Sequence, residues 1–598
     1  MRHTSRRLAR LFAASVSLLV VHAAFAADWT TPAEAARFET TPSYAETKAY
    51  LQRLADAAPA RLHLGRFGVS PEGRDLMLVV AASSGEFTPA AARGSGKPIV
   101  MVQAGIHAGE IEGKDAGLML LRDLAVGERA ALLDRVILVW LPIFNVDGHE
   151  RSNPHNRINQ DGPREMGYRA TAQNLNLNRD YMKADAPEMR DWLALFDAWQ
   201  PDLFLDIHTT NGADYQYDLT WYMEEWGPLD EGVKRWQKNA LEKRILPAYE
   251  RRGHLAAPYL DLIDHRDIRK GIGNFGSGPR YSTGYVALRN RAAVLVETHM
   301  LKPYATRVRA TFDFVLATLA EVGRDGAALR KAVERADAAT VARGAGARLA
   351  LAFETSKQSV PFELAGYASS RTPSEVSGDL WTRYDARRPQ RYSVPFFREL
   401  VASEQVEVPA AYLVPAGWPQ LAHKLREHHV RLERLDRPLR LRVDRYRLDA
   451  PQWSARSYEG RHPLREFGLR EERVELAFAA GAVLVALDQP AANVAVNLLE
   501  PRASDSLLRW GFLDAIFEQK EYADARVAEQ LARTMLDRDP ALKAAFEARL
   551  AEDAAFAASP EARLSWFYER SPWHAAQDVG AYPVVRLDAA ALARVRER

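Results

Sequence analysis

The sequence of 598 residues contains no cysteine. This absence excludes disulfide bonds, thiolate metal ligands and a lipid anchor carried on cysteine. A chain of this length can bury a core of normal size, so its fold needs no covalent cross-link. Any bound metal must be held by other side chains, such as histidines and carboxylates.

The sequence also lacks an excess of charge of either sign. Lys and Arg number 80 against 78 Asp and Glu, which gives a formal net charge of +2. This balance argues against bulk electrostatic binding, so we expect no nucleic-acid partner. With 47% hydrophobic and 26% charged residues, the composition is that of a globular protein, and the length indicates more than one domain.

Long hydrophobic runs are absent except at the N-terminus. Residues 1–26 combine early arginines, an apolar stretch over 11–21 and an Ala-Phe-Ala ending at 24–26. This pattern predicts a signal peptide rather than a membrane anchor or a core helix, because the apolar stretch is short for a membrane span. We therefore expect an exported protein, periplasmic or secreted, with no stable membrane insertion after cleavage before Ala27.

Short apolar runs alternate with segments of helical periodicity between residues 27 and 325. The runs typical of buried strands are Pro98 to Gln103, Val136 to Ile143, Leu203 to Ile207 and Ala293 to Val296, and helical segments include Glu112 to Leu124, Ala184 to Trp199 and Val233 to Arg251. This alternation predicts an α/β domain with a largely parallel central sheet.

The second half of the chain has a different character. Residues 326–345 are rich in Ala, Arg, Asp and Glu, which predicts a helical connector. Residues 346–598 mix strand-like and helical segments and contain no recognisable catalytic cluster. We expect a second, α+β region there that serves packing or substrate positioning.

The sharpest local motif is Gly-Ile-His-Ala-Gly-Glu, residues 105–110, directly after a predicted strand. A tight turn can direct His107 and Glu110 at one ion, and α/β sheets place their sites at the carboxyl ends of strands. Two common residue types at this spacing also match often by chance. His208 follows another predicted strand, Leu203 to Ile207. It is either a third metal ligand or a loop residue exposed to solvent.

Two further residues fit a hydrolytic metal site. Glu297 ends the apolar run from Val294 to Val296, and a carboxylate beside a metal can accept a proton from water. Arg179, in Asn-Leu-Asn-Leu-Asn-Arg-Asp (174–180), offers a planar fork for a carboxylate. Alternatively, Glu297 is a glutamate on an edge strand exposed to solvent, and Arg179 forms an ion pair at the surface.

Together and in this order, these motifs resemble the zinc carboxypeptidase family related to pancreatic carboxypeptidase A. The other matching motifs are Ser70-Pro71-Glu72-Gly73-Arg74, Asn145-Val146-Asp147-Gly148, Tyr168-Arg169 and Asn178-Arg179. The resemblance spans roughly residues 40–320, about half of the chain. It implies a zinc-carboxypeptidase-like mixed, mostly parallel sheet flanked by helices.

The resemblance also implies roles for individual residues. One Zn²⁺ ion would be bound by His107, Glu110 and His208. Glu297 would activate water and then protonate the leaving amine, and Arg169 would stabilise the oxyanion. Asn178 and Arg179 would bind the C-terminal carboxylate of the substrate.

Three positions depart from the family pattern. Asn176 stands where the family commonly has an aspartate that orients a zinc-bound histidine, so metal affinity would be lower. The family's mobile tyrosine falls on Phe275, and the nearby Tyr281 could substitute for it. Ser282 occupies the side-chain specificity position and marks neither an acidic nor a basic pocket.

The resemblance therefore implies an exported zinc metallocarboxypeptidase that hydrolyses the C-terminal bond of peptides and proteins through metal-activated water. The alternative is a zinc amidase or deacylase that uses the same site on cell-wall peptides or N-acyl amino acids. A binding protein with a degenerate site is a third possibility, but all ligands and Glu297 are present. Arg280 or Arg289 could favour acidic C-terminal residues.

Overall fold

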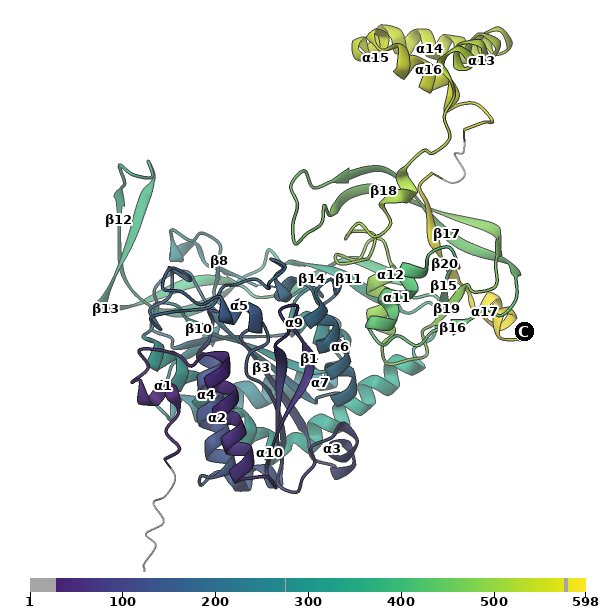
Figure 1. Ribbon diagram of the computed structural model, residues 1–598. Coiled ribbons are helices and arrows are strands. Elements are labelled where there is room, and N and C mark those ends of the chain that lie inside the picture. Colours follow the sequence, from purple (N-terminus) through teal and green to yellow (C-terminus); the bar gives the residue numbers. More distant parts are fainter. Residues whose placement is uncertain (1–27, 275, 575–578, 598) are drawn as a thin grey trace, which may run out of the picture.

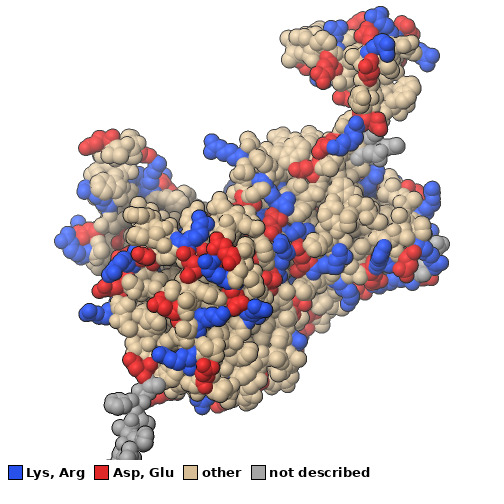
Figure 2. Space-filling view, viewed as in Figure 1, with Lys and Arg blue, Asp and Glu red and all other residues tan. Residues whose placement is uncertain are grey.

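The computed structural model describes residues 28–274, 276–574 and 579–597 (Figure 1). The predicted signal peptide, residues 1–26, and Phe275 lie outside these described ranges. Within them, no helix is both long enough and apolar enough to cross a membrane. Figure 2 shows basic and acidic side chains interspersed over the visible face, with neither sign dominating it, as the balanced composition leads one to expect.

The first half of the chain is built around an eight-stranded mixed sheet. The strands follow the order β1 (Leu62–Val69), β2 (Asp75–Ala81), β4 (Ile137–Leu141), β3 (Ile99–Ala104), β5 (Leu203–Thr210), β10 (Ala292–His299), β6 (Leu219–Met223) and β7 (Ala256–Pro258). The central strands β4, β3, β5 and β10 are parallel to one another. The β1–β2, β2–β4 and β10–β6 pairs are antiparallel.

The central strands are buried along their whole length, since every residue of β3, β4, β5 and β10 is buried. Continuous apolar runs of this kind are characteristic of parallel strands covered on both faces. The predicted α/β class with a mostly parallel sheet flanked by helices is thus confirmed.

Helices cover both faces of the sheet. One face packs against α2 (Tyr44–Ala57), α4 (Glu112–Ala125), α7 (Glu231–Ala240) and α10 (Tyr304–Ala342), and the other against α6 (Pro187–Trp199) and α9 (Ser282–Leu288). The second face is rich in aromatic rings, including Trp192, Phe196 and Tyr285. Each of these large side chains buries a large apolar area on that side.

The second half of the chain contains a six-stranded antiparallel sheet. Its order is β16 (Glu433–Arg434), β19 (Val483–Ala486), β15 (Ala411–Val414), β20 (Ala581–Leu587), β17 (Leu439–Trp453) and β18 (Leu464–Phe478). The helices α11 (Pro419–Glu427), α12 (Ala492–Leu499) and α17 (Ala589–Arg596) accompany it. Two further antiparallel pairs precede it, namely β11 (Arg348–Thr355) with β14 (Leu400–Glu407) and β12 (Val360–Pro373) with β13 (Leu380–Phe397).

A small helical bundle is inserted before β20 and stands apart from the rest of the molecule (Figure 1). It consists of α13 (Ala525–Arg538), α14 (Pro540–Glu552), α15 (Ala554–Ala558) and α16 (Pro560–Tyr568). Phe546, Trp566 and Phe567 pack together as its own apolar cluster. The bundle therefore has a core separate from that of the sheets.

The two halves of the chain share one hydrophobic core. Trp192 and Tyr285 from the first half belong to the same buried cluster as Leu421, Leu425 and Leu498 from the second. The continuous helix α10, of 39 residues, runs from the first half through most of the predicted connector at 326–345. No break in secondary structure marks residue 325, so the predicted domain boundary remains a prediction.

Helix α4 lies close to the sheet because Gly117 has no side chain. A Cβ atom at this position would lie 2.4 Å from Cε2 of Trp140 on β4. We predict that Gly117→Ala lowers the free energy of unfolding by about 1–3 kcal/mol, because the tightly packed core must shift. The measurement is urea unfolding of the mature chain.

Gly94→Ala is the matched control, since no heavy atom lies within 4 Å of a Cβ built at Gly94 in α3 (Pro89–Ser95). Alanine favours a helix over glycine by about 0.5–1 kcal/mol, so this variant should be as stable as the wild type or slightly more so. Equal unfolding midpoints for both variants would contradict the packing account.

Candidate metal centre and active site

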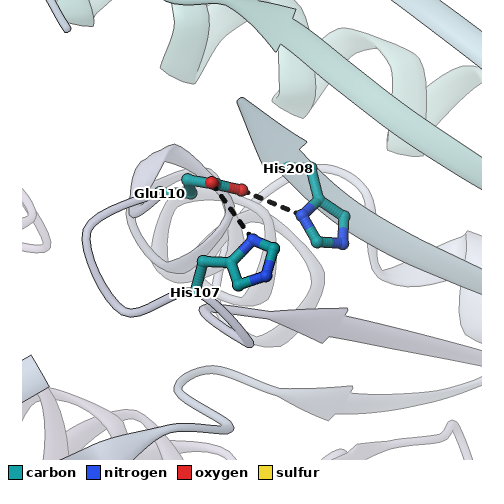
Figure 3. Close-up of side chains that lie close together, drawn as sticks. All are labelled: His107, Glu110 and His208. Atoms are coloured by element: carbon teal, nitrogen blue, oxygen red, sulfur yellow. Dashed lines mark hydrogen bonds and ion pairs between the residues drawn. The ribbon is translucent and has the colours of Figure 1, made fainter. Parts of the chain in front are cut away.

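Three side chains converge at the carboxyl ends of β3 and β5. His107 and Glu110 lie in the turn after β3, closed by a hydrogen bond from the Glu110 N–H to the His107 carbonyl. His208 lies on β5, which pairs with β3 in parallel. Glu110 Oε1 lies 3.1 Å from His107 Nδ1, and Glu110 Oε2 lies 2.9 Å from His208 Nδ1 (Figure 3).

This group has the composition and geometry of a zinc site. One ligand atom from each of the three residues lies within 4.8 Å of the others, and all three side chains are buried. Two imidazoles and one carboxylate are a common ligand set for catalytic zinc. Burial lowers the pKa of His107 to about 4, which keeps its ring in the neutral form that binds a metal.

The outer nitrogen of each imidazole has its own partner. Nε2 of His107 lies 3.1 Å from Oδ1 of Asn176, and Nε2 of His208 lies 3.0 Å from Oδ2 of Asp206. A ring that donates from Nε2 keeps the lone pair of Nδ1 for a metal. Both rings are therefore oriented with Nδ1 toward Glu110, and Asn176 and Asp206 lie behind them.

Asp206 is a residue that sequence reasoning missed. It is fully buried two residues before His208 on β5, and it accepts hydrogen bonds from Gln103 Nε2 (2.9 Å) and Ser282 Oγ (2.5 Å). Residues i and i+2 of a strand point to the same face, so the Asp-x-His spacing was an available signal. Ser282 occupies the expected specificity position, and its hydroxyl donates its hydrogen bond to Asp206.

Two arginines flank the carboxylate of Glu110. The guanidinium of Arg169 lies 3.4 Å from Glu110 Oε1. Arg157 lies closer, at 2.7 Å, and was not predicted. Gly109 makes room for it, because a Cβ there would lie 2.5 Å from Arg157 Cγ.

Asn178 and Arg179 lie next to the metal triad, on the side of His208. The side-chain nitrogen of Asn178 lies 3.5 Å from His208 Nε2, and the backbone carbonyl oxygen of Asn178 accepts a hydrogen bond from Arg179 Nη1 at 2.7 Å. The Arg179 guanidinium stacks over the ring of Tyr281, with Cζ 4.5 Å from the ring centroid. The predicted clamp residues and Tyr281 are thus neighbours.

Glu297 lies on β10, where the parallel register places it beside His208 of β5. Its side chain is buried, and Oε2 has no hydrogen-bond partner among the described residues. Burial raises the pKa of Glu297 to about 8. A buried carboxyl group with a raised pKa in a cavity is a frequent mark of a catalytic acid or base.

One cavity of about 570 Å³ joins these groups. Its lining includes the residues proposed as ligands, catalytic groups and substrate clamp, His107, Glu110, Arg169, Asn178, Arg179, His208, Tyr281 and Glu297. Arg157 and Tyr259 also line it. Arg280 and Arg289 do not, and they already pair with Asp505 and Asp197, which speaks against their use as recognition groups for an acidic substrate.

Comparison with known proteins identifies this part of the chain. Residues 47–244 match the family described as "Zinc carboxypeptidase". Residues 47–244 belong to a zinc carboxypeptidase domain. This match and the fungal relatives described next support a hydrolase of the zinc metallocarboxypeptidase type.

Fungal carboxypeptidases are similar over a longer stretch than the family match. "Carboxypeptidase 2" of Trichophyton rubrum is 24% identical over 462 residues, which cover 74% of this chain and 79% of the relative. "Probable carboxypeptidase 2" of Arthroderma benhamiae is 24% identical over 456 residues, 73% of this chain and 80% of the relative. Because each aligned stretch is longer than residues 1–345, it includes part of the second half of this chain.

Solved structures with detectable similarity include two carboxypeptidases. A metallo-carboxypeptidase from Burkholderia cenocepacia shows 18% identity and a TM-score of 0.35, over 47% of this chain and 69% of that one. The carboxypeptidase A from Helicoverpa armigera shows 19% identity and a TM-score of 0.34, over 49% of this chain and 74% of that one.

The contact between Asp206 and His208 leads to a prediction about zinc affinity. Asp206→Asn keeps the size and an oxygen acceptor but removes the charge beside the imidazole. We expect zinc to bind about 10-fold more weakly, because groups behind a metal ligand tune its basicity. Competition with a chromophoric chelator measures the affinity.

The matched control is Asp218→Asn, since Asp218 lies 2.9 Å from Nδ1 of His254, away from the cavity. This control variant should bind zinc as the wild type does. Unchanged affinity in Asp206→Asn, with both proteins folded, would remove Asp206 from the metal site.

Proposed function

We propose that this enzyme removes the C-terminal residue of peptides and proteins, with one Zn²⁺ ion bound by His107, Glu110 and His208. The observation that supports this proposal most strongly is the position of Arg179. Its guanidinium lines the same cavity as the three metal-binding side chains and Glu297. A group that binds carboxylates beside a hydrolytic centre selects chain ends over internal peptide bonds.

When bound, the zinc ion would supply Lewis acidity for the scissile carbonyl and for water. The protein side chains around it would stabilise the developing charge, transfer protons and bind the substrate. Arg169 lies beside Glu110 with its guanidinium partly exposed to the cavity. From there it would stabilise the negative charge that develops on the carbonyl oxygen.

Glu297 would act as the general base and then as the general acid. Its Oε2 atom would take a proton from the attacking water and return it to the amine of the leaving residue. A buried carboxyl group whose pKa is raised to about 8 holds a proton more readily than an exposed one, which suits the second step. A cation bound nearby would favour the ionised carboxylate of Glu297, which is the form that takes the proton from water in the first step.

Asn178 and Arg179 would hold the terminal carboxylate of the substrate, with Tyr281 stacked against the arginine. The fork of an arginine binds a carboxylate in a bidentate manner and so fixes the orientation of the chain end. The relatives named above are carboxypeptidases, which favours a peptidase over an amidase or deacylase. We further propose export through the signal peptide at 1–26, with 27–325 as the catalytic part and 346–598 as the accessory part.

The first experiment uses the mature protein and a peptide library in which each sequence occurs with a free and with an amidated C-terminus. We expect release of single C-terminal residues from the free acids alone, loss of release after chelation, and recovery when zinc is restored. Mass spectrometry follows the products. Cleavage of internal bonds, or equal cleavage of amidated peptides, would overturn the proposal.

Glu297→Gln tests the general base. We expect kcat to fall about 10²–10⁴-fold, the usual range for loss of a positioned acid or base, with bound zinc unchanged by metal analysis. Glu188→Gln is the control, because burial also raises the pKa of Glu188, to about 7, outside the cavity. It should leave kcat within twofold of the wild type, and full activity in Glu297→Gln would remove this role.

Arg179→Ala tests the clamp. We expect KM for free-acid peptides to rise about 10-fold or more, because a charge-assisted hydrogen bond is worth about 1.5–3 kcal/mol. Any slow cleavage of amidated peptides should not change. Arg66→Ala, which removes an exposed partner of Asp75, is the control, and an equal rise in KM for both peptide classes would argue against a carboxylate clamp.

A further inference from the structure

A loop of the second half of the chain reaches the active-site region. It joins β17 to β18 and is closed by a hydrogen bond from the Ser454 N–H to the Pro463 carbonyl at 2.8 Å. Its tip is a tight turn in which Tyr458 and Arg461 pair with each other. We call residues 454–463 the tip loop.

The turn of the tip loop has an uncommon backbone conformation. Glu459 and Gly460 have φ angles of +51° and +78°, and both lie in the left-handed region. This pattern is that of a two-residue hairpin turn, in which glycine or asparagine is usual and glutamate is disfavoured. A strained non-glycine residue of this kind is retained where the surrounding contacts require it.

The contacts of Tyr458 and Glu459 with the first half of the chain explain why this backbone conformation is retained. Tyr458 Oη accepts a hydrogen bond from Arg179 Nε at 3.1 Å. Glu459 Oε2 accepts one from the backbone N–H of Asn176 at 2.9 Å. Asn176 is the residue whose side chain faces Nε2 of His107. The tip loop therefore touches both the clamp and the group behind a metal ligand.

The tip loop is held firmly against the first half of the chain. Arg461 forms two hydrogen bonds to the carboxylate of Asp185, at 2.7 and 2.8 Å. The ring of Tyr458 lies parallel to that of Trp510, with centroids 6.2 Å apart. Trp510 is itself almost fully buried and donates to Asp505. These anchors fix the position of the Tyr458 hydroxyl.

Arg179 is consequently constrained from three directions. Its Nε donates to Tyr458, its Nη1 donates to the Asn178 carbonyl, and its plane stacks on Tyr281. An arginine side chain has many rotamers in solution, and binding is tighter when they are restricted beforehand. Tyr458 and Glu459 do not line the cavity themselves, so they act through the residues that do.

We propose that Tyr458 and Glu459 are positioning residues of the active site: Tyr458 for the carboxylate clamp, and Glu459 for the Asn176–His107 side of the metal centre. This inference rests on the proposed function of Arg179 and of the metal triad. It gives the second half of the chain an indirect part in substrate and metal binding, beyond packing.

The first test is Tyr458→Phe in the mature full-length chain, which keeps the ring on Trp510 and removes only the hydroxyl. We expect KM for free-acid peptides to rise about 3–10-fold, as for loss of one ordinary hydrogen bond, with kcat within twofold and amidated peptides unaffected. In an Arg179→Ala background the same change should have no further effect on KM. Tyr568→Phe, which loses a hydroxyl contact in the helical bundle, is the control.

The second test concerns Glu459 and is measured by zinc binding. Glu459→Ala removes the acceptor for the Asn176 N–H and should weaken zinc binding about threefold or more, as expected for the loss of one hydrogen bond. Glu459→Gln retains an oxygen acceptor and should restore the affinity. Equal affinity in all three proteins would overturn this half of the inference.

The outcomes separate the inference from the function on which it rests. If the proposed function is wrong, the wild type will release no residues from free-acid peptides. The zinc measurements on Glu459 would still decide the half of the inference that concerns the metal centre. If wild type and Arg179→Ala behave as proposed, an unchanged KM in Tyr458→Phe would overturn the role of Tyr458. An effect of Tyr458→Phe that persists in the Arg179→Ala background would do the same.

Discussion

The parallel pairing of β3, β5 and β10 is the constraint on which the site depends. The turn after β3 carries His107 and Glu110, β5 carries His208 and β10 carries Glu297, and pairing brings these strand ends to one edge. Glu110 then stands between two imidazoles, and Glu297 lies beside His208 in register. The surrounding groups, Asp206 and Asn176 behind the rings and Arg169 beside the carboxylate, orient this arrangement rather than create it.

Much of this arrangement could be predicted from the sequence, because the informative residues follow recognisable apolar runs. His107, His208 and Glu297 each come at or near the end of a buried strand, and the structure places all three in one cavity. Asp206 was missed because it lies inside such a run, although its spacing of two residues from His208 placed both side chains on the same face of β5. Arg157 belongs to an irregular loop between elements, and its approach to Glu110 depends on the absence of a side chain at Gly109.

Contacts between distant parts of the chain were beyond the sequence for another reason. Tyr458 and Glu459 are 279 and 283 positions away from the residues they contact, and local patterns contain no information on such pairs. Their region showed no catalytic cluster, and it contributes through a hydroxyl and a carboxylate acting on other side chains. The shared core around Trp192 and Tyr285 holds the two halves together closely enough for these contacts to form.

The position of β20 has a consequence for how the enzyme is made. This strand, Ala581–Leu587, lies between β15 and β17 in the middle of the second sheet, although it comes after the helical bundle in the chain. During synthesis, β17 and the loop that follows it emerge long before the strand that must pair with β17. The second sheet cannot close until Ala581–Leu587 is available to pair with β15 and β17, so the first half of the chain can fold before the second sheet is complete.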